Sequence, residues 1–265
     1  MSNEPSPQQQ TISLQAISQN FLGALQRQFD LLVYNLAAAA QVNAERYDAI
    51  SRQLKLMPVP QLHQNFAQTQ GYARNLLVRQ TFNDLASMAS ACLNSCHLLC
   101  QLIKNQAALK IDEQAANKAV GEAQQAFEQA ALNDKFERLE KDFSIMCGTE
   151  DAIIAIAVAF RVLMTRNGIV AADDVNEDGE LVFEFKTVQN IPPAKEAGAQ
   201  PEVRVVDLRR VFREGDQLEL SNSELLGLSI TVTAFFHDLF KAVDEYGART
   251  LGVQPSPDTS VAGQN

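Results

Sequence analysis

Apolar residues recur every three or four positions along most of the chain up to Arg166, which is the spacing of amphipathic helices. Pro58 and Pro60 interrupt the first long stripe, because proline has no amide donor and disfavours helix in the residue before it. A last stripe begins after Ser221. The pattern predicts helices over 11–56, 61–109, 113–146, 150–166 and 222–246. The period of the run 113–146 slips near Asn133 and Asp134, so this run is either one kinked helix or two helices with Asp134 capping the second.

Beyond Gly168 the apolar period changes to two, as Leu181, Phe183 and Phe185 alternate with more polar neighbours. We expect further strands over 203–206 and 217–220, with a short helix or turn over 208–213 between them. Ser221 and Glu224 form a capping box at the start of the final helix. The predicted fold is mainly α, a long antiparallel helical bundle with a small antiparallel β insertion, 171–220, before the C-terminal helix.

The two ends of the chain are rich in Pro, Ser, Gly and Gln, so we expect disordered tails over 1–10 and 248–265 around one bundle over 11–247. No basic segment followed by an apolar one stands at the N-terminus, which favours a cytoplasmic protein. The run Ala152–Phe160 is much shorter than the roughly 20 residues that cross a bilayer. We therefore expect no association with a membrane.

The chain carries a net charge of −10, which argues against broad capture of a nucleic-acid backbone. One basic cluster stands out against this background. Its arginines could neutralise phosphates or pair with the acidic segment 173–184, and in so acidic a chain we favour internal pairing. The cluster comprises Arg204, Arg209, Arg210 and Arg213.

Three cysteines, Cys92, Cys96 and Cys100, follow one another at intervals of four residues beside His97. Sulfur ligands on one helix side could hold a soft metal, but a closed metal site draws ligands from more than one element. Unpaired cysteine is among the most buried residue types. We expect these side chains to pack in the core, and we expect no cofactor.

An acidic loop follows the helix that ends at Arg166. Its oxygen-bearing residues match the start of an EF-hand-like calcium loop, in which several oxygens converge on one turn. The position of the last ligand is occupied by Phe185, and a strand follows where a helix is expected. We favour a solvated acidic turn, with a calcium site as the alternative. The candidate ligands are Asp174, Asn176, Asp178 and Glu180.

The sequence MTRNGIV, followed by an acidic loop, a strand and a last amphipathic helix, resembles the C-terminal half of HEPN-superfamily proteins over 150–247. In that family a helix ends in RNxxxH, and the arginine and histidine act on RNA phosphate across a dimer interface. Arg166 and Asn167 match the motif, and Ala171 stands at the histidine position. The resemblance implies a helical bundle with a dimer surface that binds rather than cuts, because no imidazole is available for proton transfer.

These observations predict a non-enzymatic helical interaction or regulatory protein that self-associates as a homodimer or binds another protein. The long apolar stripes and the missing catalytic constellations are its basis. Two alternatives remain open at this stage. One is a HEPN-like ribonuclease or toxin acting on RNA through Arg166 and Asn167. The other is a calcium-modulated binding protein.

Overall fold

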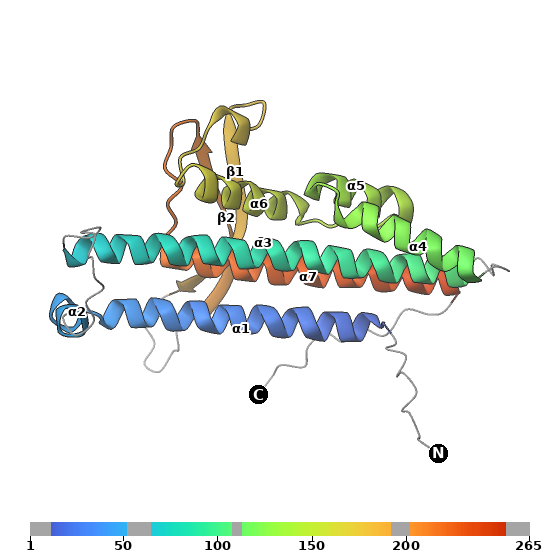
Figure 1. The fold of residues 1–265 in the computed structure, drawn as a ribbon, viewed down its shortest axis with the longest axis horizontal. Coiled ribbons are helices and arrows are strands. Elements are labelled where there is room, and N and C mark those ends of the chain that lie inside the picture. The colour runs from blue at the N-terminus through green and yellow to red at the C-terminus, as the bar shows by residue number, and fades with distance from the viewer. Residues whose placement is uncertain (1–11, 52–64, 108–112, 192–201, 253–265) are drawn as a thin grey trace, which may run out of the picture. The chain divides into compact units, whose positions relative to one another are not determined.

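A computed structural model describes residues 12–51, 65–107, 113–191 and 202–252. Within them the chain forms seven α-helices and one antiparallel hairpin, which precedes the last helix (Figure 1), so the predicted fold class is confirmed. In chain order the elements are α1 Leu14–Gln41, α2 Ala44–Ser51, α3 Phe66–Ala107, α4 Glu113–Glu128, α5 Leu132–Phe143, α6 Glu150–Thr165, η1 Ala172–Asp174, β1 Glu180–Ile191, β2 Glu202–Arg213 and α7 Asn222–Leu251.

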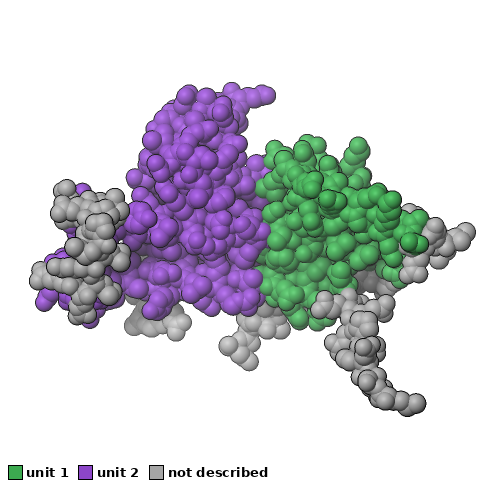
Figure 2. Space-filling model, in the orientation of Figure 1, with its two compact units in different colours: residues 1–22, 90–148, 236–265 green, residues 23–89, 149–235 purple. Residues whose placement is uncertain are grey.

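The chain divides into two compact units (Figure 2). Unit 1 contains 1–22, 90–148 and 236–265, and unit 2 contains 23–89 and 149–235. Helices α1, α3 and α7 each contribute residues to both units. Helices α4 and α5 belong to unit 1, whereas α2, α6 and the hairpin belong to unit 2.

Unit 1 has a core of aromatic rings and small apolar side chains. His97 is buried and stacks on Phe127 with ring centroids 3.9 Å apart, while Phe143 meets Tyr246 edge-on at 5.2 Å. The buried Lys135 donates from Nζ to Asn94 Oδ1 at 2.9 Å and lies over the Phe127 ring. Polar side chains in this core are therefore satisfied by neutral partners, as burial requires.

Helix α6 of unit 2 has little polar surface. Its residues Ile153, Ile156 and Val162 are buried, which agrees with the rule that a helix apolar on most sides is surrounded by protein. The hairpin presents its apolar face to the same core, where Phe183 meets Phe82 edge-on at 6.3 Å. The alternation in β1 thus becomes one buried and one exposed face.

Strand β1 approaches α7 closely at Gly227. A Cβ added at Gly227 would lie 2.4 Å from the backbone oxygen of Lys186, so the approach requires a residue without a side chain. One turn later, Thr231 Oγ1 accepts the Lys186 N–H at 2.8 Å. The edge of the hairpin is therefore joined to α7 by a backbone group rather than by apolar contact alone.

Two of the predicted helices are divided in the structure. The predicted helix 11–56 is interrupted at Val42 and Asn43, where Asn43 Oδ1 accepts the Arg46 N–H at 2.9 Å and caps α2. The predicted helix 113–146 appears as α4 and α5. An N-cap can stop a helix without disturbing the apolar period, which is why periodicity alone did not find the first break.

The segment before α7 differs more from expectation. Strand β2 continues through Arg213, so the helix or turn predicted over 208–213 is extended strand. The segment 217–220 is not part of the sheet, and only Gln217 forms an isolated bridge, with Ile169. The pairing partner of 208–213 is 180–185, distant in sequence, and this pairing overrides local preference.

The last helix, α7, continues to Leu251, past the predicted end at 246. The rest of the predicted tail and the N-terminal tail 1–10 lie outside the described residues. So do parts of the predicted helices, 52–56, 61–64 and 108–109.

Helices α3 and α7 are long and apolar enough to cross a membrane by length and composition alone. Their most apolar windows are 39% and 56% buried in the structure, and core helices pass the same test. The apolar residues of these two helices are spaced along the chain rather than continuous, so no single apolar run marks them in the sequence. The expectation of no membrane association stays a prediction.

Candidate functional site

Helix α6 ends at Arg166 and Asn167, the two residues that match the RNxxxH motif. The N–H groups of Arg166 and Gly168 both donate to Val162 O, at 3.0 and 3.1 Å, and so close the last turn. Asn167 and Gly168 have left-handed backbones with φ of 55° and 89°. The φ of Gly168 favours glycine at this stop, whereas Gln217 Nε2, which would lie 2.4 Å from an added Cβ, is the end of a flexible side chain that can move.

Arg166 is bound to a buried carboxylate. Asp174, at the end of η1, has a side chain with 0% exposure and accepts Arg166 Nη1 at Oδ2. Its Oδ1 accepts Arg161 Nη2 at 2.8 Å. We call Arg161, Arg166 and Asp174 the aspartate clamp. The motif arginine is therefore engaged within the chain, where it fixes the loop after α6.

Hydrogen bonding at the aspartate clamp favours the charged carboxylate. Burial by itself would raise the pKa of Asp174. The backbone N–H of Ala171, at 3.0 Å from Oδ2, and the two guanidinium groups more than offset this effect. The pKa of Asp174 is lowered as a result. Ala171, at the position of the family's histidine, contributes a backbone donor.

The four calcium candidates do not converge. Asp174 faces the arginines, and Asn176 Oδ1 accepts the N–H groups of Asp178 and Glu180, both at 3.0 Å. The carboxylate of Glu180 pairs with arginines of β2. In the described part of the chain, no three His, Cys, Asp or Glu side chains are grouped so that they could hold a metal ion. The calcium site stays a prediction.

The basic cluster lies along β2 and is largely paired. Arg209 approaches Glu180 and Glu184 at 3.7 and 3.5 Å, and Arg213 approaches Glu180 at 3.3 Å. Arg210 binds Glu224, which caps α7 in the capping box expected with Ser221.

The pKa of Glu224 reflects opposing effects. Burial would raise it, but the Ser221 hydrogen bonds and Arg210 lower it below its usual value. Arg204, the fourth member of the basic cluster, is an exposed residue that stands opposite Gln189 in the register.

The cysteine group lies in the core of unit 1. Cys92, Cys96 and Cys100 are buried free thiols. The hydrogen bond to Cys92 and burial raise the pKa of Cys96, and burial raises that of Cys100, so both remain protonated. His97 hydrogen-bonds to Gln124 at 2.7 Å, and burial lowers its pKa. These groups have the surroundings of core side chains.

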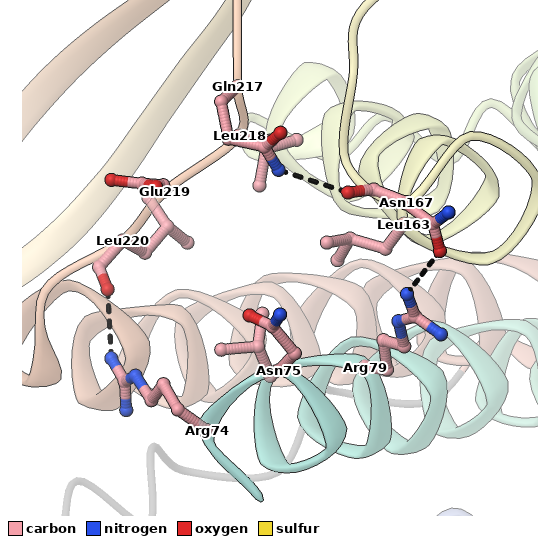
Figure 3. Close-up of a pocket in the computed structure, with 10 residues that line it drawn as sticks. Arg74, Asn75, Arg79, Leu163, Asn167, Gln217, Leu218, Glu219 and Leu220 are labelled. Carbon is pink, nitrogen blue, oxygen red and sulfur yellow. Dashed lines mark hydrogen bonds between the residues drawn. The ribbon is translucent and has the colours of Figure 1, made fainter. Parts of the chain in front are cut away.

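A cavity of about 550 Å³ lies beside the end of α6, inside unit 2 (Figure 3). Asn167 forms part of its wall and is held from two sides: Arg79 Nη2 donates to its Oδ1 at 2.7 Å, and Gln217 Nε2 donates to its backbone oxygen at 3.0 Å. Ten residues line the cavity: Arg74, Asn75, Val78, Arg79, Leu163, Asn167, Gln217, Leu218, Glu219 and Leu220.

Sequence reasoning found one wall of this cavity, at Asn167, and missed the other. Arg74 and Arg79 are the only lysine or arginine residues between Phe66 and Ile103, which is the only signal the sequence offers. Arg74 reaches across to Leu220, 146 residues away, where its Nη2 donates to the backbone oxygen at 2.8 Å. No local pattern marks such a contact.

Comparison with known proteins adds no assignment, since no family model, curated protein or solved structure matches the chain. The resemblance to HEPN-superfamily proteins thus rests on Arg166, Asn167 and the order of elements around them.

Proposed function

We propose that this chain is a helical interaction module that self-associates through the second half of α1 and acts by binding rather than by catalysis. The observation that carries the proposal is a long uncharged surface on this helix. Between Asp30 and Glu45 the chain has no charged residue. Most side chains of this stretch are nevertheless exposed.

Large apolar side chains are concentrated in that stretch. Leu31 is 63% exposed and Tyr34 is 70% exposed, three residues apart and so on one side of the helix. Val42, directly after the end of the helix, is 45% exposed and follows on the same side. We call Leu31, Tyr34 and Val42 the α1 strip. Its buried counterpart is Leu32, which faces the core of unit 2 with 2% exposure.

A second copy of the same chain suits the α1 strip. Each chain carries a net charge of −10, so two copies repel each other wherever their acidic surfaces meet. An uncharged strip avoids this repulsion at the point of contact. Between Leu31 and Gln41 the helix advances about 15 Å, long enough for two copies to pair antiparallel around a twofold axis.

The engagement of the predicted nuclease groups also supports binding over cleavage. Arg166 is paired with a buried aspartate, and Asn167 is held by Arg79 and Gln217. Among the described residues, the side chains that hold Arg166 and Asn167 are Asp173, Asp174, Arg79 and Gln217, and none of them is a histidine. The contacts that surround these residues are those of a helix end.

Self-association is tested by light scattering at micromolar concentration. The wild type is expected at twice the mass of one chain, and Leu31→Glu/Tyr34→Glu at the mass of one chain, because four carboxylates would then meet across the twofold axis. Met146→Glu is the matched control, since Met146 is 71% exposed but lies in unit 1. A monomeric wild type, or a double variant that keeps the dimer mass, would contradict the proposal.

A further inference from the structure

We infer that the cavity beside the end of α6 binds a small organic anion, with a carboxylate or phosphate group held by Arg74 and Arg79 and an apolar body against the leucines of the wall. This goes beyond self-association and does not depend on it. The cavity and the α1 strip share no residue.

The first reason to expect an anion in the cavity is positive charge that the chain does not compensate. Within the described residues, neither Arg74 nor Arg79 forms an ion pair, although most other arginines of unit 2 do. Glu219, the one acidic residue of the lining, is exposed. Two cationic groups thus line a cavity in a chain of net charge −10. An anion supplies the charge that the surrounding chain does not.

The second reason to expect an anion is the incomplete hydrogen bonding of Arg74. Its Nη2 donates to Leu220 O, but its buried Nη1 has no hydrogen-bond partner in the described part of the structure. A buried donor without an acceptor is costly, more so on a charged group. Burial also lowers the pKa of Arg74, which means that its charge is destabilised here. An acceptor oxygen at Nη1 removes both penalties.

The remaining lining fits a ligand with two kinds of surface. Leu163, Leu218 and Leu220 supply apolar wall, and Asn75 and Gln217 supply amides. Figure 3 draws Arg74 toward Leu220 and Arg79 toward Asn167, with Asn75 between them. The volume of about 550 Å³ lies within the usual range of ligand pockets, roughly 300–1,000 Å³. Short acyl or alkyl chains with one charged head fit this description.

Titration calorimetry with three probes tests the inference: hexanoate, hexyl phosphate and neutral hexanol. Binding of hexanoate, of hexyl phosphate or of both supports it, and the tighter of the two identifies the preferred head group. Hexanol, which has the same chain without a charge, is expected to bind at least about tenfold more weakly. Hexanol binding as tight as that of the anions, or no binding by any probe, would overturn the inference.

Variants then locate the binding. Arg74→Gln removes the charge and is expected to weaken the anion at least about tenfold. Asn75→Phe leaves both arginines in place and fills the cavity, and it should abolish binding. Arg27→Gln is the control, because Arg27 is an exposed arginine of the same unit. Circular dichroism checks folding, and Asn75→Phe together with Arg79→Gln carries the test if Arg74→Gln does not fold.

Two outcomes keep this inference separate from self-association. The Leu31→Glu/Tyr34→Glu variant should bind the same probe with unchanged affinity, because it leaves the cavity lining intact. Unchanged affinity in both Arg74→Gln and Asn75→Phe would overturn the cavity as the binding site, whatever the oligomeric state.

Discussion

Unit 2 contains two pairs of arginines that differ in what the chain offers them. In the aspartate clamp, Arg161 and Arg166 meet a fully buried carboxylate, Asp174. Among the residues that the structure describes, Arg74 and Arg79 donate to a backbone carbonyl and an amide oxygen, at 2.8 and 2.7 Å, and to no carboxylate. Arginines that find a carboxylate within the chain thus hold the loop after α6 in place. Arginines that find none line the cavity beside the end of α6.

The largest effect that this comparison predicts is the loss of the clamp. Asp174→Ala removes the carboxylate that accepts from two guanidinium groups and from the Ala171 N–H. Arg161 is half exposed and can turn to solvent, which limits the cost. We expect the free energy of unfolding to fall by about 2–4 kcal/mol, measured by urea denaturation followed by circular dichroism.

Asp173→Ala is the matched control for this substitution. Asp173 is the adjacent residue, its side chain is 85% exposed, and its carboxylate lies 3.6 Å from Arg166. Exposed ion pairs contribute little, so the change should stay within about 1 kcal/mol. Equal losses at both positions would show that burial does not distinguish the two carboxylates.

The pH dependence of stability sharpens the comparison further. Because the folded-state pKa of Asp174 is lowered, its contribution is fully present above the unfolded-state pKa of about 3.9 and is lost as pH falls through the folded value. The difference in unfolding free energy between wild type and Asp174→Ala should therefore be largest near pH 7 and shrink below about pH 4. Glu224 titrates in both proteins and cancels. A difference that is constant from pH 7 to pH 3 would contradict the charged clamp.

The smallest change in the free energy of unfolding is expected for the pair Arg74 and Arg79. Arg74→Met loses one hydrogen bond to Leu220 but also removes a partly buried charge with an unpaired donor. These contributions oppose each other, so the free energy of unfolding should change by no more than about 1 kcal/mol. Denaturation under the same conditions as for Asp174→Ala makes the comparison direct. A loss as large as that at Asp174 would show that both pairs are structural.

The parts of the fold that the sequence predicts best are those with local causes. Helix α6 begins after Gly148 and Thr149 and ends before Gly168. The glycines at the two ends and the apolar run between these glycines predict both limits. The capping box at Ser221 is likewise a local feature. The helix or turn predicted over 208–213 was wrong because these residues pair with β1, which is separate in sequence, and because Arg209 and Arg213 form ion pairs with Glu180 there.

The candidate site divides in the same manner. Asn167 could be found because it lies in a short motif at a helix end. The role of Arg166 could not be read from that motif, since its partner Asp174 also fits the pattern of a calcium loop. Arg74 and Arg79 become neighbours of Gln217 and Leu220 only when α3 packs beside the segment before α7. Such a site is a product of tertiary structure.

The close approach at Gly227 has an evolutionary consequence. An added Cβ there would meet the backbone of Lys186, whereas at Gly71, Gly121 or Gly148 it would meet nothing within 4 Å. Among descendants of this chain, Gly227 should therefore be fixed as long as the hairpin stays on α7. The three unconstrained glycines are free to drift. A lineage that has lost the hairpin would reveal itself first by a side chain at position 227.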